Sequence, residues 1–264
     1  MTTASSAKIA FMHIPKTGGV SVIDAFQRSF GAARCLSFSS VITNKQFEEK
    51  EFVSGHVYLG DIEGEFFKFS FLRDPLKQIV SHLSWIDRYN DPKNSDEFPL
   101  LSPSVQQGVL ALKDVDFGSP KEVDRYLREL PEASDLRVRN LQTELISFKR
   151  GMVQPMNARA LAQLAVSQLE RLDFIGLCES MTEDMQALFD LLNRPFPEKI
   201  HRLNANEFRR PPVDLKDDAM RRTLERYVEA DQRLYEHVLS RRNKGTESTI
   251  GEIASRIRKL LTRG

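Results

Sequence analysis

Cysteine and net charge are both scarce in this chain, and each scarcity excludes a class of protein. The 264 residues include two cysteines, Cys35 and Cys178, too few for a disulfide framework. Both lie in apolar stretches, which predicts buried free thiols in a reducing compartment. The 38 lysines and arginines are balanced by 37 aspartates and glutamates, so the formal net charge is only +1. This balance argues against a general nucleic-acid-binding protein, and any anion must be recognised by a local cluster.

Long hydrophobic runs are also missing. No apolar stretch approaches the ~20 residues that span a bilayer, so the sequence predicts no transmembrane segment. Residues 1–7 lack the apolar core of a signal peptide and are predicted to be a short flexible leader. A cytoplasmic location is therefore expected. The hydrophobic content of 41% and charged content of 28% are ordinary for a globular protein. The length suits one α/β domain, or at most two small ones, and a single domain is predicted over residues 1–245.

The hydrophobic pattern alternates between strand-like and helix-like segments, which predicts a central parallel sheet covered by helices on both faces, with extra C-terminal helices. Strands are expected near 8–14, 33–38, 51–54, 66–72 and 173–177. Helices are expected near 20–30, 75–89, 120–129, 135–148, 157–171, 181–193 and 217–242. Two proline-rich segments, 90–119 and 194–216, are predicted to be loops near a cleft, and the second contains Arg209 and Arg210. Residues 246–264 form a predicted basic amphipathic helix that packs on the domain, pairs with a second copy or lies on a membrane surface.

One glycine-bearing turn stands between a strand and a helix near the N-terminus. Residues 8–25 read KIAFMHIPKTGGVSVIDA, in which an apolar run stops at Pro15 and a helical pattern begins after Gly19. Such a turn directs backbone N–H groups at one point before a helix, which favours an anion such as phosphate. Lys16 adds a full positive charge but precedes the glycines, unlike a Walker A lysine. A tight turn without any ligand accounts for these residues equally well.

A second strand–turn–helix segment follows at residues 69–85, FSFLRDPLKQIVSHLSW. Asp74 suits the N-cap and Pro75 the first turn of the helix. Arg73 then sits at the carboxyl end of a strand, where open α/β sheets bind ligands, and an arginine can hold phosphate bidentately. Ser81 lies two helical turns further on and faces roughly the same way. The alternatives are an ion pair for Arg73 and a solvated or back-bonded serine.

These segments resemble the sulfotransferases that use 3′-phosphoadenylyl sulfate (PAPS). HIPKTGGVS is similar to their 5′-phosphosulfate loop, and FLRDPLKQIVSHLSW is similar to their 3′-phosphate segment. FVSGHVYL, residues 52–59, resembles the Gly-His-Val segment of the carbohydrate branch, of the heparan sulfate 2-O type. LRVRNLQTELISF (136–148) and DFIGLCE (173–179) resemble two later segments of that branch. The resemblance covers about residues 8–205 and implies a P-loop-like three-layer α/β/α fold.

The resemblance also implies a site and a reaction. Lys16 would stabilise the leaving phosphate, and His56 would be the general base that takes the proton of an acceptor hydroxyl. Val20 stands where the family commonly has threonine, which removes one hydroxyl contact. No metal is expected. The residues implied to bind the donor are Pro15, Lys16, Thr17, Gly18, Gly19, Val20, Ser21, Arg73 and Ser81.

The acceptor side is less defined. His56, Asn140 and Gln142 are predicted to bind the acceptor, although the two amides equally suit the solvated face of a helix. The implied partners are a nucleotide donor and a hydroxyl acceptor, on a carbohydrate or another molecule, with no nucleic acid; a homodimer or a peripheral contact through 246–264 is also open. A P-loop-type nucleotide kinase and an inactive nucleotide-binding module are the alternative functions.

Overall fold

A computed structural model of the protein describes residues 8–130, 136–197, 199–201 and 209–243. The chain divides into two compact units. The first comprises Met1–Arg73, Gln142–Leu203 and Arg233–Gly264, and the second comprises Asp74–Leu141 and Asn204–Gln232. The predicted leader 1–7 and the predicted helix 246–264 lie outside the described residues. These two predictions and the single domain over 1–245 stay predictions.

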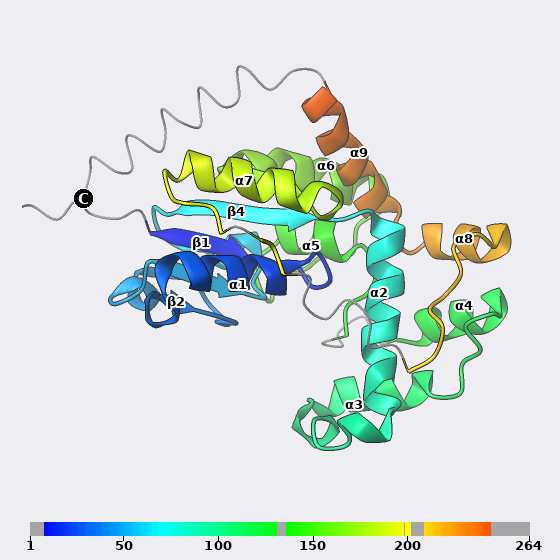
Figure 1. Ribbon diagram of the computed structural model, residues 1–264. Coiled ribbons are helices and arrows are strands. Elements are labelled where there is room, and N and C mark those ends of the chain that lie inside the picture. The colour runs from blue at the N-terminus through cyan, green and yellow to red at the C-terminus, as the bar shows by residue number, and fades with distance from the viewer. Residues whose placement is uncertain (1–7, 131–135, 198, 202–208, 244–264) are drawn as a thin grey trace, which may run out of the picture. The chain divides into compact units, whose positions relative to one another are not determined.

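The centre of the first unit is a five-stranded parallel sheet (Figure 1). Its order is β2-β3-β1-β4-β5, and Met12 at the end of the central strand lies beside both Gly55 and Ser70. All five predicted strands are confirmed. Their bounds are β1 Ile9–Met12, β2 Cys35–Leu36, β3 Phe52–Gly55, β4 Phe67–Leu72 and β5 Phe174–Leu177.

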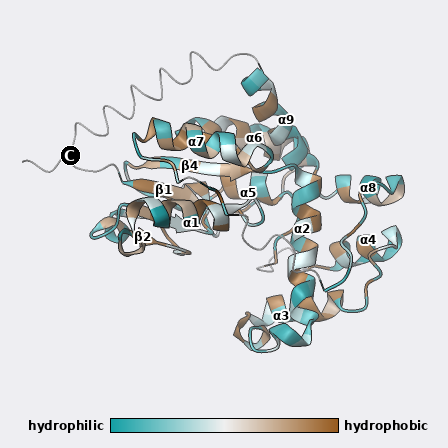
Figure 2. Ribbon diagram, viewed as in Figure 1, coloured by the Kyte–Doolittle hydropathy of each residue, from teal (hydrophilic) through white to brown (hydrophobic). Residues whose placement is uncertain are grey.

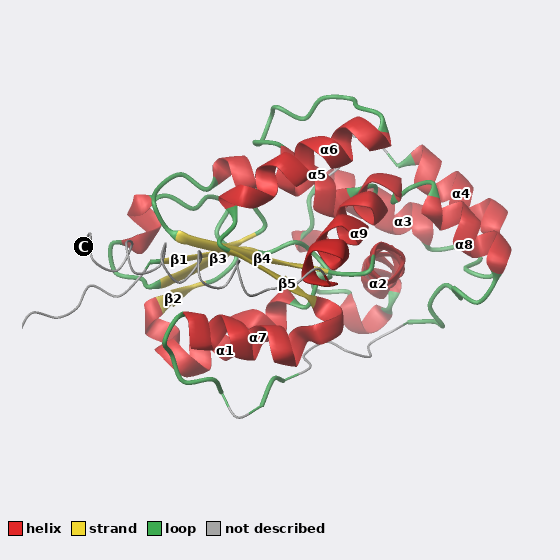
Figure 3. Ribbon diagram, turned by 90° about the horizontal axis from the view of Figure 1, so that it is seen from above, coloured by secondary structure: helices red, strands yellow, loops and turns green. Residues whose placement is uncertain are grey.

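Helices cover both faces of this sheet, which confirms the predicted three-layer α/β/α fold. Figure 3 shows α1 and α7 on one face and α5 and α6 on the other. Phenylalanine side chains fill the layer beneath α1: the rings of Phe26 and Phe52 stack at 4.3 Å, and those of Phe11 and Phe69 at 4.7 Å. The helices with residues in the first unit are α1 Gly19–Phe30, α5 Leu141–Ser147, α6 Ala158–Gln168, α7 Met181–Leu191 and α9 Glu229–Asn243.

The strand order places a switch point at the centre of the sheet. The chain leaves β1 through α1 toward β2, whereas it leaves β4 toward β5 on the opposite side. Ligands of open α/β sheets bind at the carboxyl ends of strands where connections diverge in this way. The segments after β1 and β4 are the two that the sequence singles out.

The second unit is helical. Its helices are α2 Pro75–Asp87, α3 Pro103–Leu112, α4 Pro120–Glu129 and α8 Asp218–Glu225. Each of α4 and α8 carries both hydrophilic and hydrophobic residues, as Figure 2 shows. Asp74 caps α2 as predicted, accepting from Lys77 N–H at 2.9 Å, and Pro75 is its first residue.

The expectation of a loop-rich segment over 90–119 is wrong in part, because it contains α3. Val105, Val109 and Leu112 recur at helical spacing and are buried against the core of the unit. Pro103 marks the first helical residue, where proline is favoured, and not a loop. The predicted helix over 217–242 is two helices, α8 and α9.

A buried carboxylate ties the second proline-rich segment to α2. Asp87, 1% exposed, accepts two hydrogen bonds of 2.9–3.0 Å from each of Arg209 and Arg210. These two arginines therefore have an internal partner. Neither Cys35 nor Cys178 forms a disulfide; Cys35 is buried as predicted, but Cys178 is only half-buried. None of the helices that the structure describes is long and apolar enough to cross a membrane.

Candidate active site

The turn between β1 and α1 is built to leave helix N–H groups uncapped. Gly18, with φ of 82°, is the N-cap of α1, and no side chain among the described residues caps the helix. Lys16 also has a positive φ, 68°, which is uncommon for a residue with a side chain. Thr17 is buried, and its hydroxyl donates to Ile14 C=O at 2.9 Å, which closes the turn from within. Because Ser21 N–H already donates to Gly18 C=O at 3.0 Å, the N–H groups of Gly19 and Val20 are the ones that the first turn of α1 offers to an anion.

Packing requires glycine at position 19, whereas Gly18 is favoured mainly by its positive φ. A Cβ at Gly18 would lie 2.5 Å from Met181 Cε, and a Cβ at Gly19 would lie 2.0 Å from His13 Cδ2. The second of these contacts is with a side chain that is only 4% exposed and has little room to move. The two glycines thus let α1 begin directly against the end of β1 and the start of α7.

Arg73 follows β4 and reaches the same turn. Its guanidinium Nη1 donates to Lys16 C=O at 3.1 Å. Its backbone is held by Gln142 on α5, whose Oε1 accepts from Arg73 N–H and whose Nε2 donates to Arg73 C=O, both at 2.9 Å. Gln142 is 1% exposed. The side chain that was predicted to bind the acceptor thus has a demonstrable role in positioning Arg73.

Asn140 likewise uses its amide on the backbone. Its side-chain Oδ1 accepts from Ala230 N–H at 2.8 Å, and its backbone N–H donates to Tyr227 C=O at 3.0 Å. Its φ of 44° separates α5 from the chain before it, which explains why the helix predicted over 135–148 begins only at Leu141. The predicted contact of Asn140 with an acceptor stays a prediction.

His56 follows β3 and faces a second histidine. The ring centroids of His56 and His13 lie 4.5 Å apart, and the exposed ring of Phe38 lies 5.7 Å from that of His56. Burial and the Lys16 ammonium lower the pKa of His56 below 6.5, although part of its surface stays open to solvent. Burial, His56 and Lys16 lower the pKa of His13 well below 6.5. Both imidazoles are therefore neutral at pH 7, the form that accepts a proton.

Other predicted site residues take ordinary places. Ser21 is buried in the first turn of α1, and Pro15 and Val20 are half-buried on either side of the glycines. Ser81 is half-buried on α2, in the second unit, and its role rests on the resemblance alone. The described part of the chain contains no group of three or more His, Cys, Asp or Glu side chains placed to hold a metal ion.

The first unit thus brings three chemical groups to the carboxyl edge of neighbouring strands: His56 after β3, Lys16 after β1 and Arg73 after β4. The arrangement provides a neutral base and two cations at one edge of the sheet. His13 and Phe38 were not singled out from the sequence. A histidine at the end of a buried strand, directly before the glycine turn, was an available signal for the first, whereas Phe38 carries no sequence signal.

Two comparisons with known proteins bear on these observations. No curated protein matches the chain in sequence. A family model described as the sulfotransferase family matches residues 1–241. Since this match covers most of the chain, including every group described above, the protein belongs to the sulfotransferase family.

Proposed function

We propose that the protein transfers a sulfuryl group from PAPS to a hydroxyl of a carbohydrate. The observation that carries this proposal is the contact between the guanidinium of Arg73 and the carbonyl of Lys16, which joins the two segments that resemble donor-binding motifs. Sulfuryl transfer, like phosphoryl transfer, depends on positioning and on charge stabilisation. The family supports the transfer of sulfuryl groups in general; the donor, the acceptor and the residue roles are our inference.

In this proposal the reaction is an in-line displacement. His56 takes the proton of the acceptor hydroxyl, whose oxygen forms a bond to sulfur. The bond between sulfur and the bridging oxygen breaks, and the electron pair stays on the 5′-phosphate of adenosine 3′,5′-bisphosphate. Lys16 stabilises the charge that develops on that oxygen, and the N–H groups at the start of α1 hold the phosphate. The products are a sulfate ester and the bisphosphate.

Arg73 is assigned to the 3′-phosphate of the donor. A guanidinium can donate two parallel hydrogen bonds to a phosphate, which an ammonium cannot. The two hydrogen bonds from the Gln142 side chain hold the backbone of Arg73 and so fix the position from which its side chain extends. Ser81 is proposed as a second ligand of the 3′-phosphate on the resemblance of its segment.

The test is transfer from ³⁵S-labelled PAPS to a pool of oligosaccharides and phenols. Lys16→Ala is expected to lower turnover by about 10²–10³-fold while bisphosphate binding persists, and His56→Ala by about 10²–10⁴-fold. The matched control is His201→Ala, because His201 pairs with Asp24 at 3.2 Å on the exposed surface of α1. Wild-type turnover in His56→Ala would refute the assignment of the base. Wild-type turnover in Lys16→Ala would refute the assignment of Lys16.

A further inference from the structure

Phe38 has two features that are unfavourable for a phenylalanine with no ligand against its ring. Its φ of 59° lies in the left-handed region, where a bulky aromatic residue is a genuine outlier. Its side chain is also 56% exposed, so most of an apolar ring faces water. Strained backbone of this kind persists where the surrounding structure determines it, and it concentrates at ligand-binding sites.

The backbone after Phe38 is held firmly against the strand that carries the proposed base. Ser39 N–H donates to Ser54 C=O at 2.8 Å, so the chain continues the pairing of β2 with β3. Ser39 C=O lies so close to Gly55 that a Cβ there would be 2.0 Å from the oxygen. Gly55 directly precedes His56, and the two contacts therefore fix Phe38 beside it.

The ring of Phe38 borders the imidazole pair. Its centroid lies 5.7 Å from that of His56, at an interplanar angle of 76°, and 5.8 Å from that of His13. His13 is 4% exposed, and its Nδ1 has no hydrogen-bond partner among the described residues. An apolar ring thus stands open to solvent next to a base and next to a buried polar atom that is left unsatisfied.

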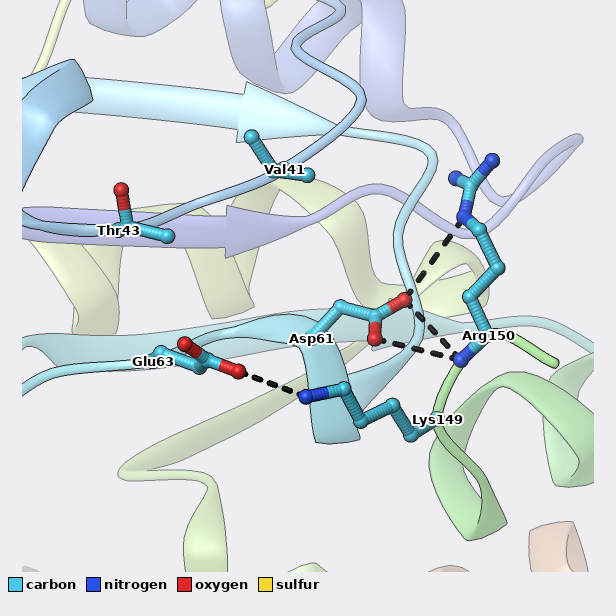
Figure 4. Close-up of a pocket in the computed structure, with 6 residues that line it drawn as sticks. All are labelled: Val41, Thr43, Asp61, Glu63, Lys149 and Arg150. Carbon is cyan, nitrogen blue, oxygen red and sulfur yellow. Dashed lines mark hydrogen bonds and ion pairs between the residues drawn. The ribbon is translucent and has the colours of Figure 1, made fainter. Parts of the chain in front are cut away.

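The same segment continues into an open pocket of about 350 Å³ whose lining includes four charged residues (Figure 4). Val41 lies at its wall only three residues after Phe38, a stretch that spans at most ~11 Å. The other walls carry two acid–base pairs: Glu63 with Lys149 at 2.7 Å, and Asp61 with the N–H of Arg150 at 3.2 Å. Charged groups of both signs suit a ligand with many hydroxyl groups.

We propose that Phe38 is the platform on which the ring of the acceptor lies, with its reacting hydroxyl toward His56. This inference rests on the proposed function and makes it more specific. A phenyl ring binds a flat apolar face, which either the C–H face of a pyranose or a phenol provides. The charged side chains of the pocket further along the segment favour the sugar, whose neighbouring residue would extend toward them.

The test is saturation-transfer NMR with the bisphosphate-bound protein. The probes are methyl pyranosides of glucose, galactose and mannose, with 4-nitrophenol as the phenolic arm and sorbitol as the acyclic polyol. Wild-type protein is expected to saturate the ring C–H protons of at least one pyranoside and not the protons of sorbitol. Phe38→Ala should lower that signal at least fivefold, and Phe38→Trp should restore it. The matched control is Leu110→Ala, which removes an equally exposed apolar side chain (58%) in the second unit.

A stability measurement separates a binding role from a structural one. Glycine tolerates a positive φ, so Phe38→Gly should unfold at the same urea concentration as the wild type or at a higher one. Asn193→Gly, at φ of 51°, should behave in the same way. Only Phe38→Gly should lose the NMR signal of the pyranoside ring protons. A pyranoside signal that survives in Phe38→Ala would overturn the inference, as would its absence from wild-type protein with bisphosphate bound. A signal from 4-nitrophenol alone would overturn the assignment to a sugar. Failure to bind the bisphosphate would instead overturn the proposed function.

Discussion

Gln142 is the residue whose replacement tests the construction of the site most sharply. Its side chain is 1% exposed and makes two 2.9 Å hydrogen bonds to the backbone of Arg73. Gln142→Ala would leave one N–H and one C=O without partners, and each such group costs about 1–3 kcal/mol when it is buried. Because Arg73 is half-buried, water compensates for part of this loss. We expect the free energy of unfolding to fall by about 2–4 kcal/mol.

Urea unfolding followed by circular dichroism measures this change. The matched control is Gln186→Ala, which removes an exposed hydrogen bond of 2.8 Å to Asp190 on α7 and should cost less than about 0.5 kcal/mol. Bisphosphate affinity should also fall in Gln142→Ala, because the backbone of Arg73 is no longer held. Equal stability of the two variants would refute the reasoning. A loss of turnover without a loss of stability would show instead that Gln142 contacts the acceptor.

Three further changes test other contacts by urea unfolding. Gly19→Ala should lower the free energy of unfolding by about 1–3 kcal/mol, because its Cβ would lie 2.0 Å from His13. Wild-type stability should fall as the pH drops below 6.5, because His13 and His56 take up protons in the unfolded chain but have a lowered pKa when folded. Each of the two contributes up to about 1.4 kcal/mol per pH unit, so His13→Asn should reduce this slope. Asp87→Asn should cost about 2–4 kcal/mol, since two arginines lose their buried partner.

For each of these three predictions, one result would contradict the reasoning. Gly118→Ala is the control for Gly19→Ala, because its Cβ would meet only the Asp116 side chain at 3.3 Å; equal effects would remove the argument from crowding. Identical pH slopes of wild type and His13→Asn would show that His13 is not held neutral. A cost below about 0.5 kcal/mol for Asp87→Asn would show that the two arginines are satisfied elsewhere.

The elements that the sequence predicts well are those determined by local chemistry. The strand that ends at Leu72, the cap at Asp74 and the proline at the start of α2 follow one another along the chain, so their roles could be read in order. The glycine turn before α1 was predictable for the same reason. By contrast, Pro103 concealed α3, because proline marks both loops and the first residue of a helix.

The contacts that build the site are not local, and the sequence could not predict them. Gln142 lies 69 positions from Arg73, and nothing in its own segment indicates that its partner is a backbone. The positive φ of Phe38 arises from the way its segment joins β3, since phenylalanine has no preference for that region. Sequence reasoning thus located the strands that carry the candidate site but not the residues that hold it in shape.

The central claim is that the chain binds a nucleotide with a 3′-phosphate. The most direct measurement is calorimetric titration with adenosine 3′,5′-bisphosphate, alongside adenosine 5′-phosphate and ATP with magnesium. The account predicts micromolar binding of the bisphosphate and a clear preference for it over the other two, with the preference lost in Arg73→Ala. No binding of the bisphosphate, or a preference for ATP with magnesium, would contradict it.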